Sequence, residues 1–534
     1  MSTPDASRQS TDAIEEALDE FDCWAPVLLG RHGVAGIAVG VTYEGRRWTR
    51  CVGTRSRTGR HSVNTETMFS VQSVSKLFTA TAVMTLVESG EIDLDAPVIE
   101  YLPEFTVQSA FELHPERRIT LRHLLSHTAG LTHEAPVGSN YDLGSGPFED
   151  HCASISQTWL RFPVGHHCEY SNLGVDLAGL IVQRTTGLPF AAAAHELLLR
   201  RLGLPRTTFD ESLVRAAENR ADGHEPGFAA VPLTIPMVPS GALYTCLDDA
   251  LTFVEAHQNR CAGLMSGPTY LDMLRIPFAP EGQEYGYALG VHHQNRGRGL
   301  PVCGHAGNGF GFHADLLWSD HGRFGLALLV NDGHPAVKWR IADRLLDRLA
   351  TAWRLPRSFP RTPTPGVVPV SDAAAFTGQY VGRDGIATVT AQSGLTVQQS
   401  ETTEALTATD RVDVFAGESH AFQFLRHEDG DVGYMRRMSD GATYYRNVAT
   451  DSQQIVAVEG TYELDQWGVT VCTLTVERVD DSPVLQMRWT DGTRQRLWLR
   501  HVSAKVLRTS TGETLDFTRT PATYAGLTLR AVHR

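Results

Sequence analysis

Residues 70–78 read SVQSVSKLF and open a stretch that continues to Gly90. Apolar residues recur in this stretch at three- and four-residue spacing, which predicts a helix with one buried face. Gly90 is typical of the residue that ends such a helix in the left-handed conformation. Ser73 and Lys76 stand at the start of the stretch in an S-x-x-K pattern. Three residues are almost one helical turn, so their side chains are expected to lie on the same face and to meet.

Ser73 and Lys76 are the residue types that act as a nucleophile and its base. A serine hydroxyl is a poor nucleophile until a neighbouring group takes its proton. A lysine whose pKa is lowered by burial can take that proton, or can lower the pKa of another base beside it. A serine in the first helical turn also has free backbone N–H groups directed at any oxyanion formed there. Alone, the pattern is weak evidence, because many ordinary core helices contain a serine and a lysine at this spacing.

A second candidate segment is Tyr170-Ser171-Asn172, which joins a loop to an apolar helical stretch. A tyrosine at such a junction can simply pack. Beside Lys76, however, a phenol loses its proton more easily than at its free pKa of about 10. Tyr170 is therefore a candidate general base toward the serine.

A third segment, residues 302–311, reads VCGHAGNGFG and is the most glycine-rich part of the chain. It leads into apolar runs at 312–318 and 324–330, which predict two strands joined by a turn. Glycines beside a strand let a substrate backbone approach closely. No helix opens after the glycines, so the pattern does not predict a dinucleotide site.

The composition limits the class of protein. A chain of 534 residues is expected to form two or three domains, and 42% hydrophobic with 20% charged residues is ordinary for a soluble protein. A formal charge of −14 argues against nucleic acid or an anionic membrane as a partner. The first twenty residues lack a signal-peptide pattern, and no apolar run reaches the about 18 residues of a membrane span. Eight cysteines without paired spacing predict reduced thiols, and a cytoplasmic location is expected.

The chain is predicted to divide at a proline-rich joint. Residues 355–370 read LPRSFPRTPTPGVVPV, with five prolines, and predict a semi-rigid linker. Before it, an amphipathic helix at 11–31 and a β-hairpin at 34–52 begin a mixed α/β (α+β) domain. After it, two blocks of short alternating segments predict small antiparallel, lipocalin-like β-barrels, in which closure removes exposed sheet edges. The predicted boundaries are 1–354, 355–370, 371–452 and 453–534.

Other histidine motifs are interpreted as structural. Residues 119–131 predict a short helix ending at Gly130, in which His127 is a packed and hydrogen-bonded core residue. Two His-Glu pairs lack the second histidine of an H-E-x-x-H metal motif. The cluster at 166–168 (His-His-Cys) has no distant ligand pair. Neither a metal nor another cofactor is expected.

Taken together and in this order, S-x-x-K, Tyr-x-Asn and His305-Ala306-Gly307 resemble the penicillin-binding and class C β-lactamase-like serine hydrolases (peptidase S12-like) over about residues 25–350. The resemblance implies an antiparallel sheet built from both ends of the domain, beside a helical region. It further implies that Ser73 is acylated, that Lys76 and Tyr170 share the role of base, and that Asn172 positions the substrate amide. The backbone N–H groups of Ser73 and Asn308 would bind the oxyanion.

The sequence departs from this family at one motif. His305-Ala306-Gly307 stands where β-lactamases and DD-peptidases carry Lys-Thr-Gly, whose lysine faces a substrate carboxylate. A neutral histidine attracts a carboxylate weakly, so β-lactam hydrolysis is not expected. His-x-Gly with two C-terminal barrels resembles the bacterial D-aminopeptidases. That resemblance implies hydrolysis of small amides, peptides or esters with selectivity for D-residues, with His305 and Gly307 at the site.

Two alternatives share parts of the pattern. One is a penicillin-binding-type thioesterase, which releases or cyclises nonribosomal peptides and generally has a single C-terminal barrel. The other is a carboxylesterase of the same family. In each case the partner is a small molecule or short peptide, and a homo-oligomer is compatible with the sequence. Physiological substrate, stereoselectivity and the choice between hydrolysis and aminolysis stay open at this point.

Overall fold

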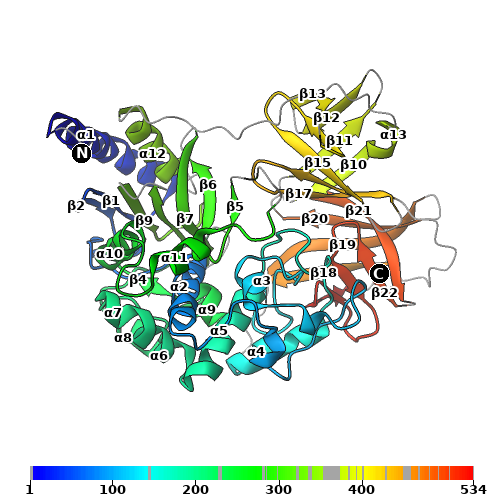
Figure 1. Cartoon of the computed structure of the whole chain (residues 1–534). Coiled ribbons are helices and arrows are strands. Elements are labelled where there is room, and N and C mark those ends of the chain that lie inside the picture. The colour runs from blue at the N-terminus through cyan, green and yellow to red at the C-terminus, as the bar shows by residue number, and fades with distance from the viewer. Residues whose placement is uncertain are drawn as a thin grey trace. The chain divides into compact units, whose positions relative to one another are not determined.

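The computed structural model (Figure 1) describes residues 4–141, 146–225, 231–279, 283, 285–296, 299–319, 324–334, 340–352, 373–382, 385–391, 394–399, 402–409, 411–426, 430–448, 459–466, 469–479, 482–490, 492–503 and 505–532. The chain divides into two compact units. The first unit consists of Met1–Ala96, Val175–Ile276 and Tyr287–Phe359, and the second consists of Pro97–Gly174, Pro277–Gly286 and Pro360–Arg534.

The first unit is organised on a seven-stranded sheet. In the order β2-β1-β9-β8-β7-β6-β5, its strands are Arg46–Gly53, Gly36–Tyr43, Phe324–Val330, Phe312–Ser319, Leu300–Gly309, His292–Arg296 and Gly286–Tyr287. The hairpin of β1 and β2 turns at Glu44 and Gly45, both with positive φ. β1 also pairs antiparallel with β9, with Ile37 opposite Val330. The sheet is therefore built from segments almost 300 residues apart, as the family resemblance implies.

Helices cover both faces of this sheet. On one face, α1 (Pro4–His32) and α12 (Arg340–Ala352) form a hydrophobic core with every second residue of β1, among them Val39. On the other face, α10 (Leu247–Gln258) lies so close that a Cβ on Gly40 would stand 2.7 Å from Leu251. The helix α2 (Ser75–Glu88) packs on α10, with the rings of Phe78 and Phe253 stacked at 3.6 Å.

The remaining helices of the first unit are short. They are the 3-10 turn Gln72–Val74, α6 (Phe190–Ala194), a π-helical turn at His195–Leu199, α7 (Arg200–Leu202), α8 (Glu211–Ala216), α9 (Val238–Gly241) and α11 (Gly267–Leu274). A two-stranded ribbon joins β3 (Phe69–Ser70) to β4 (Tyr244–Thr245). α5 (Asn172–Thr186) begins in the second unit and continues into the first.

The second unit contains two β-barrel sheets. The first is a closed barrel of β10 (Gly378–Gly382), β11 (Gly385–Thr390), β12 (Leu395–Gln399), β13 (Thr402–Ala408), β14 (Val414–Ala416), β15 (Ala421–Arg426), β16 (Val432–Arg437) and β17 (Thr443–Arg446). Aromatic side chains such as Tyr380 and Phe424 fill its interior, and α13 (Ala373–Phe376) contributes Phe376 to that core.

The second sheet has nine strands. They are β18 (Gly460–Gln466), β19 (Val469–Val479), β20 (Ser482–Trp489), β21 (Arg494–Ser503), β22 (Val506–Thr509), β23 (Thr514–Asp516), β24 (Thr523–Tyr524), β25 (Leu527–Thr528) and β26 (Arg530–Ala531). Its two edge strands, β25 and β26, are separated only by Leu529, so the sheet is nearly closed. The predicted fold class, a β-lactamase-like domain followed by two antiparallel barrels, is confirmed.

The segment Pro97–Gly174 forms part of the second unit and packs on the barrels. Its helices are the 3-10 turns Val98–Glu100, Pro115–Arg117 and Ser154–Gln157, with α3 (Leu121–Leu125) and α4 (Phe148–Ala153). Tyr141 packs against the core of the second barrel, and the His167 ring meets the Tyr445 hydroxyl of the first at 2.9 Å. No pattern in the sequence predicted this packing.

Two details qualify the sequence predictions. The helix expected at 119–131 spans only Leu121–Leu125, because the chain turns at His127, whose φ is +58°. The predicted linker at 355–370 lies outside the described residues, so the boundaries 1–354, 371–452 and 453–534 stay predictions. None of the described helices combines the length and apolarity needed to cross a bilayer.

Candidate active site

Ser73 lies in the 3-10 turn that leads directly into α2, and its side chain is half-buried. Lys76 is fully buried in the first turn of α2. Its Nζ donates a hydrogen bond to Ser73 Oγ at 3.1 Å and another to the Ser240 carbonyl at 2.7 Å. The hydroxyl and the amine therefore touch, in the arrangement that proton transfer between them requires.

Asp176 fixes the position of the Ser240 carbonyl. Both the backbone N–H and the hydroxyl of Ser240 donate to its carboxylate, each at 2.9 Å. Asp176 is fully buried, so these bonds are formed in a low-dielectric environment where they are strong. The sequence contains no signal for this role, because the two residues are 64 positions apart.

The turn that carries Ser73 is held in an unusual backbone conformation. Gln72 has φ of +48°, which is uncommon for a residue with a side chain and persists only where neighbours enforce it. Ser75 supplies one restraint, since its hydroxyl donates to the Gln72 carbonyl at 2.5 Å and accepts from the N–H of Leu243 at 3.0 Å. The Gln72 amide donates to Ser70 Oγ at 2.7 Å. These bonds fix the direction in which Ser73 projects.

The strand β7 passes directly beside this turn. A Cβ atom on Gly307 would stand 2.0 Å from the carbonyl oxygen of Val71 and 3.0 Å from the backbone nitrogen of Ser73. Only glycine lets the two backbones approach so closely. Gly307 thus sets the spacing between β7 and the N–H of Ser73.

His305, two residues earlier on β7, is buried and neutral. Burial lowers its pKa to about 3, and the charge of Lys76 lowers it as well. Its Nδ1 lies 2.6 Å from the Ala306 carbonyl, which can only accept, so Nδ1 carries the proton. Nε2 then accepts from the Tyr287 hydroxyl at 2.6 Å. A neutral imidazole held in this way does not supply a positive charge.

Asn308, next along β7, begins a chain of buried polar contacts. Its Oδ1 lies 2.9 Å from His313 Nδ1, and His313 Nε2 lies 2.9 Å from Asp315. Asp315 in turn pairs with Arg296 at 2.9 Å. Burial alone would raise the pKa of Asp315, but Arg296 and His313 lower it to about 2. This chain anchors the Asn308 side chain, and none of its deeper members was predicted.

The other two predicted residues, Tyr170 and Asn172, belong to the second unit. Asn172 is buried, and its amide donates to Glu134 at 2.7 Å. Glu134 also accepts from the Asn140 amide at 2.5 Å. Burial would raise the pKa of Glu134, yet His133 and these amides keep it below its ordinary value. Glu134, which follows His133 in one of the two incomplete H-E-x-x-H motifs of the sequence, is the anchor of Asn172.

Tyr170 packs beside His127 in the same unit. Their ring centroids are 4.4 Å apart, and His127 Nδ1 accepts from the backbone N–H of Ser171 at 3.2 Å. His127 is buried and hydrogen-bonded, as predicted, and its structural role stays a prediction. Ser73, Lys76, His305, Gly307 and Asn308 come together in the first unit, whereas the approach of Tyr170 and Asn172 to Ser73 stays a prediction.

The buried histidines of the first unit predict a loss of stability in acid. Burial lowers the pKa of both His257 and His305 to about 3. Between about pH 6.5 and 3 the unfolded chain binds these protons and the folded chain does not, so stability falls as pH falls through that window. We expect His257→Gln to reduce the proton uptake on unfolding at pH 5 by about one, measured from the pH dependence of urea denaturation. His61→Gln, at an exposed position, is the control; an equal reduction in both variants would contradict the prediction.

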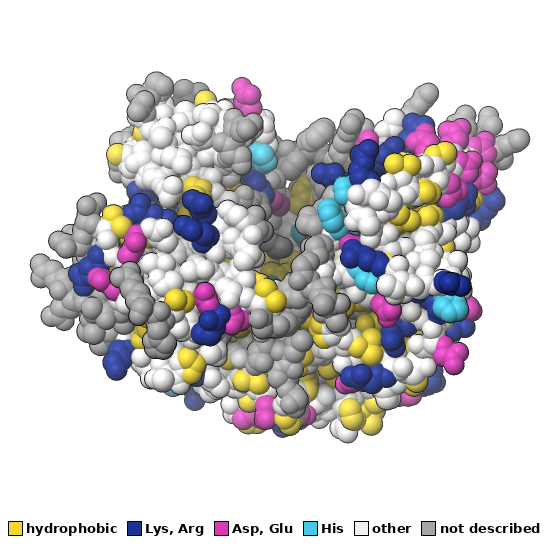
Figure 2. All heavy atoms as spheres, turned by 180° about the vertical axis from the view of Figure 1, so that it is seen from behind, with side chains coloured by type: hydrophobic (Ala, Val, Ile, Leu, Met, Phe, Trp, Pro, Cys, Tyr) yellow, Lys and Arg dark blue, Asp and Glu magenta, His cyan; other side chains and the backbone are white. Residues whose placement is uncertain are grey.

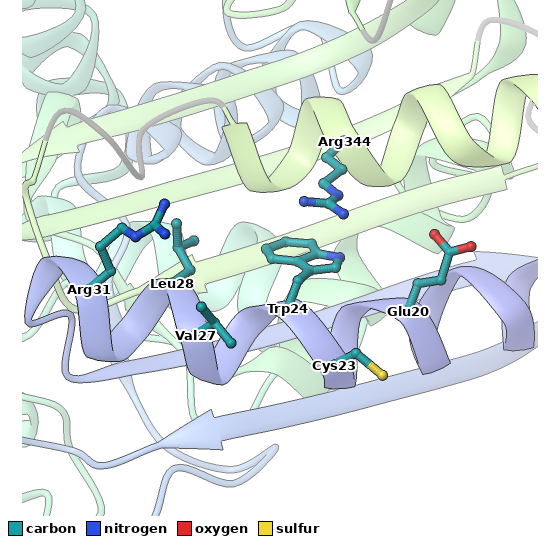
Figure 3. A pocket seen from close by; sticks show the side chains of 7 residues that line it. All are labelled: Glu20, Cys23, Trp24, Val27, Leu28, Arg31 and Arg344. Atoms are coloured by element: carbon teal, nitrogen blue, oxygen red, sulfur yellow. The ribbon is translucent and has the colours of Figure 1, made fainter.

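A groove of about 470 Å³ on the opposite side of the sheet is distinct from this site (Figure 3). α1 contributes Trp24 and Val27 to it, and α12 contributes Arg344, whose guanidinium lies 4.7 Å from the Trp24 ring centre. In Figure 2 a hydrophobic patch bordered by charged side chains covers this region at the upper right. The groove contains none of the predicted site residues. Within the described ranges, no group of three metal-ligating side chains is placed to hold an ion.

A family model described as Beta-lactamase matches residues 11–351. Among curated proteins, the chain is 30% identical over 211 residues to Esterase EstB of Burkholderia gladioli, covering 38% of this chain and 53% of that protein. It is 31% identical over 242 residues to Penicillin-binding protein 4 of Amycolatopsis lactamdurans, covering 43% and 61%. It is 25% identical over 245 residues to the D-alanyl-D-alanine-carboxypeptidase/endopeptidase AmpH of Escherichia coli (strain K12), covering 46% and 62%. The matched part spans about half to three fifths of the length of these relatives.

Among solved structures, "Crystal structure of SurE with D-Leu" matches with a TM-score of 0.57 and 24% identity, covering 82% of this chain and 99% of that one. "Crystal structure of SurE" matches with a TM-score of 0.58, covering 83% and 100%. These likenesses concern the fold. They extend beyond the part matched by the family model, so the fold likeness includes residues of the C-terminal barrels.

Proposed function

Because the chain belongs to the Beta-lactamase family, we propose that it is a serine hydrolase that works through an acyl-enzyme on Ser73. The observation that carries this proposal is the contact of Lys76 Nζ with Ser73 Oγ at 3.1 Å, at the start of a buried helix. Ser73 is half-exposed, while its partner amine is fully buried and fixed by the Ser240 carbonyl.

In the proposed acylation step, the Ser73 hydroxyl gives its proton to the base formed by Lys76 and Tyr170, and Oγ bonds to the substrate carbonyl carbon. The carbonyl oxygen becomes an oxyanion, which the backbone N–H groups of Ser73 and Asn308 stabilise. When the tetrahedral intermediate collapses, the leaving amine or alcohol takes the proton from the same base. Water then attacks the acyl-enzyme, with the base accepting its proton, and Ser73 regains its own.

The proposed substrate class is small amides, peptides or esters whose acyl group is a D-amino-acid residue with a free amino group. The neutral, buried His305 supports this class over β-lactams, because it offers no charge to a substrate carboxylate. The name of the relative AmpH, a D-alanyl-D-alanine-carboxypeptidase/endopeptidase, supports action on D-residues. The two C-terminal barrel sheets also support this class, because the thioesterase alternative generally has a single barrel.

A substrate panel tests this proposal. Purified protein is assayed with D- and L-aminoacyl p-nitroanilides, each with a free and an acetylated amino group, and with the matching thioesters and a β-lactam. We expect kcat/KM at least tenfold higher for free D-aminoacyl anilides than for their L or acetylated counterparts. Fast turnover of thioesters alone, with product diverted to an added amine, would instead identify the thioesterase and acyltransferase alternative. Absence of turnover on the whole panel would reject the proposal.

Gly307 provides a prediction about the oxyanion site. In Gly307→Ala the added methyl would meet the Val71 carbonyl at 2.0 Å, so β7 must move away from the Ser73 N–H. Loss of one oxyanion donor lowers kcat by about 10²–10³-fold where it has been measured. We expect a loss of that size in kcat, with the folded structure retained by circular dichroism.

The matched control is Gly30→Ala, since nothing lies within 4 Å of a Cβ at that helical position. Its kcat is expected to equal that of the original chain. A Gly307→Ala variant with full activity would show that β7 does not define the oxyanion site.

A further inference from the structure

Four arginines meet around a small cavity of the second unit, where the two barrels and the segment Pro97–Gly174 come together. They line a volume of about 30 Å³, and three of them lie on strands and one in a loop of that unit: Arg446, Arg500, Arg508 and Arg161. Among the residues that the structure describes, no aspartate or glutamate lines this arginine pocket. A cationic pocket contrasts with the chain's formal charge of −14.

Two of the arginines are placed directly opposite each other. Arg500 on β21 and Arg508 on β22 are cross-strand partners in the antiparallel register. Their neighbours Leu499 and Leu507 point into the second barrel's core, so the two arginines share its outer face. Like charges at directly opposed positions destabilise a sheet. This pair therefore needs a compensating negative charge.

Neither member of the pair has a carboxylate partner among the described residues. The Arg500 side chain makes no hydrogen bond or ion pair there. The Arg508 guanidinium lies 4.7 Å from the ring centre of Phe111, and its Nη1 is buried without a hydrogen-bond partner. Burial lowers the pKa of Arg508, and the charge of Arg500 lowers it further. An unpaired donor on a buried charged group is expensive in free energy.

The other two arginines do not supply the missing charge. Arg446 donates to two backbone carbonyls, Val432 at 3.2 Å and Thr377 at 2.6 Å. Arg161 is the only one of the four with acidic partners in the described part of the chain: Glu513 at 2.7 Å and Glu169 at 3.7 Å. Those two carboxylates face Arg161, which leaves three guanidinium groups uncompensated.

We propose that the arginine pocket binds one small tetrahedral oxyanion, phosphate or sulfate. The planar guanidinium fork matches such an anion with two parallel hydrogen bonds. Thr509 and Ser510 also line the pocket. This site is separate from the proposed hydrolase chemistry and does not depend on it.

Anion binding at this position would steady the segment that leads to Tyr170. Arg161 connects the pocket both to Glu513 of the second barrel and to Glu169, the residue before Tyr170. Neutralising the pocket removes the repulsion that otherwise acts on Arg161. The bound ion is thus a structural element of the second unit.

Thermal denaturation of the full chain at constant ionic strength tests the proposal, with phosphate, sulfate, acetate or chloride as the varied anion. A ligand that binds only the folded state raises the free energy of unfolding by RT ln(1 + c/Kd) at free ligand concentration c, so Tm rises with the logarithm of ligand concentration above Kd. We expect phosphate and sulfate to raise Tm in this way, with acetate and chloride ineffective. Calorimetric titration with phosphate should show one site, and Arg500→Gln and Arg508→Gln should each weaken it at least tenfold.

The chain supplies a matched control. Arg494 on β21 also faces an arginine across the strands, Arg488, but both are exposed and solvated. Arg494→Gln should leave phosphate affinity unchanged. In chloride, Arg508→Gln should raise Tm by relieving repulsion, whereas in saturating phosphate it should lower Tm relative to the original chain. A merely structural arginine would not produce this reversal of sign.

Three results would overturn the proposal. One is a Tm that responds equally to phosphate and chloride. The second is an equal loss of phosphate affinity in Arg494→Gln. The third is stabilisation by acetate as strong as by phosphate, which would make the ligand a carboxylate rather than a tetrahedral oxyanion.

Discussion

Ser73→Ala is expected to abolish turnover, with a fall in kcat of about 10⁶-fold, the size seen when a catalytic serine is removed from a hydrolase that works as a unit. Without Oγ no acyl-enzyme can form, while Lys76 remains bonded to the Ser240 carbonyl and the helix α2 is unchanged. Intact-protein mass spectrometry after a fluorophosphonate or slow acyl substrate should show a single adduct in the original chain. Peptide mapping should place it on Ser73, and the variant should show none.

The same substitution at the other end of α2 is the control. The Ser89 hydroxyl donates to the Leu86 carbonyl at 3.1 Å and to the Glu91 carboxylate at 2.8 Å, and both partners are local. Ser89→Ala should keep full activity and full labelling. An adduct on any serine other than Ser73 would reject the assignment of the nucleophile.

Lys76→Ala and Tyr170→Phe are each expected to lower kcat by about 10²–10⁴-fold, the usual contribution of a general base. If Lys76 and Tyr170 act on the same proton, removing the second group from a variant that already lacks the first should change kcat little. The double variant should therefore lose far less than the sum of the two single losses in activation free energy. Single-turnover acylation rates measure this more directly than kcat, because they exclude deacylation.

Two control variants accompany the Lys76 and Tyr170 substitutions. Lys76→Met keeps most of the side-chain volume in the buried site and should be as inactive as Lys76→Ala, which separates the role of the amine from packing. Tyr43→Phe, in the core between the sheet and α1, should leave kcat unchanged. Additive losses in the double variant would show that Lys76 and Tyr170 act on different protons.

Local patterns in the sequence were sufficient where structure depends on neighbouring residues. The short apolar run that begins at residue 34, followed by Glu44-Gly45 and a second run, predicted the hairpin. Both turn residues adopt positive φ in the structure. The three- and four-residue spacing after Ser73 predicted α2, and Gly90 ends it with φ of +77°. The contact between Ser73 and Lys76 follows from the same spacing.

Contacts between distant residues could not be read in this way. Asp176, which fixes the Ser240 carbonyl, and Glu134, which holds Asn172, are ordinary acidic residues in the sequence. Their importance arises from burial, which only the folded chain creates. The conformation of Gln72 likewise depends on Ser75 and on its bond to Leu243. The glycine content of 302–311 indicated a close backbone approach somewhere in that segment. The sequence did not indicate that the approach is between Gly307 and the backbone of Val71 and Ser73.

The packing of the segment Pro97–Gly174 on the barrels has a consequence for the order in which the chain folds. Gln157 accepts a hydrogen bond from Arg519, which is 362 residues later in the chain. Arg161 likewise forms its ion pair with Glu513, near the end of the second barrel. A ribosome adds about 5–20 residues per second, so these partners appear tens of seconds apart. During synthesis the apolar surfaces around Tyr141 must stay uncovered until the second barrel has been synthesised. Completion of the second unit therefore depends on the segment that contains residues 513 and 519, and a nascent chain stopped before residue 513 presents Arg161 without its carboxylate partner and an open core to chaperones.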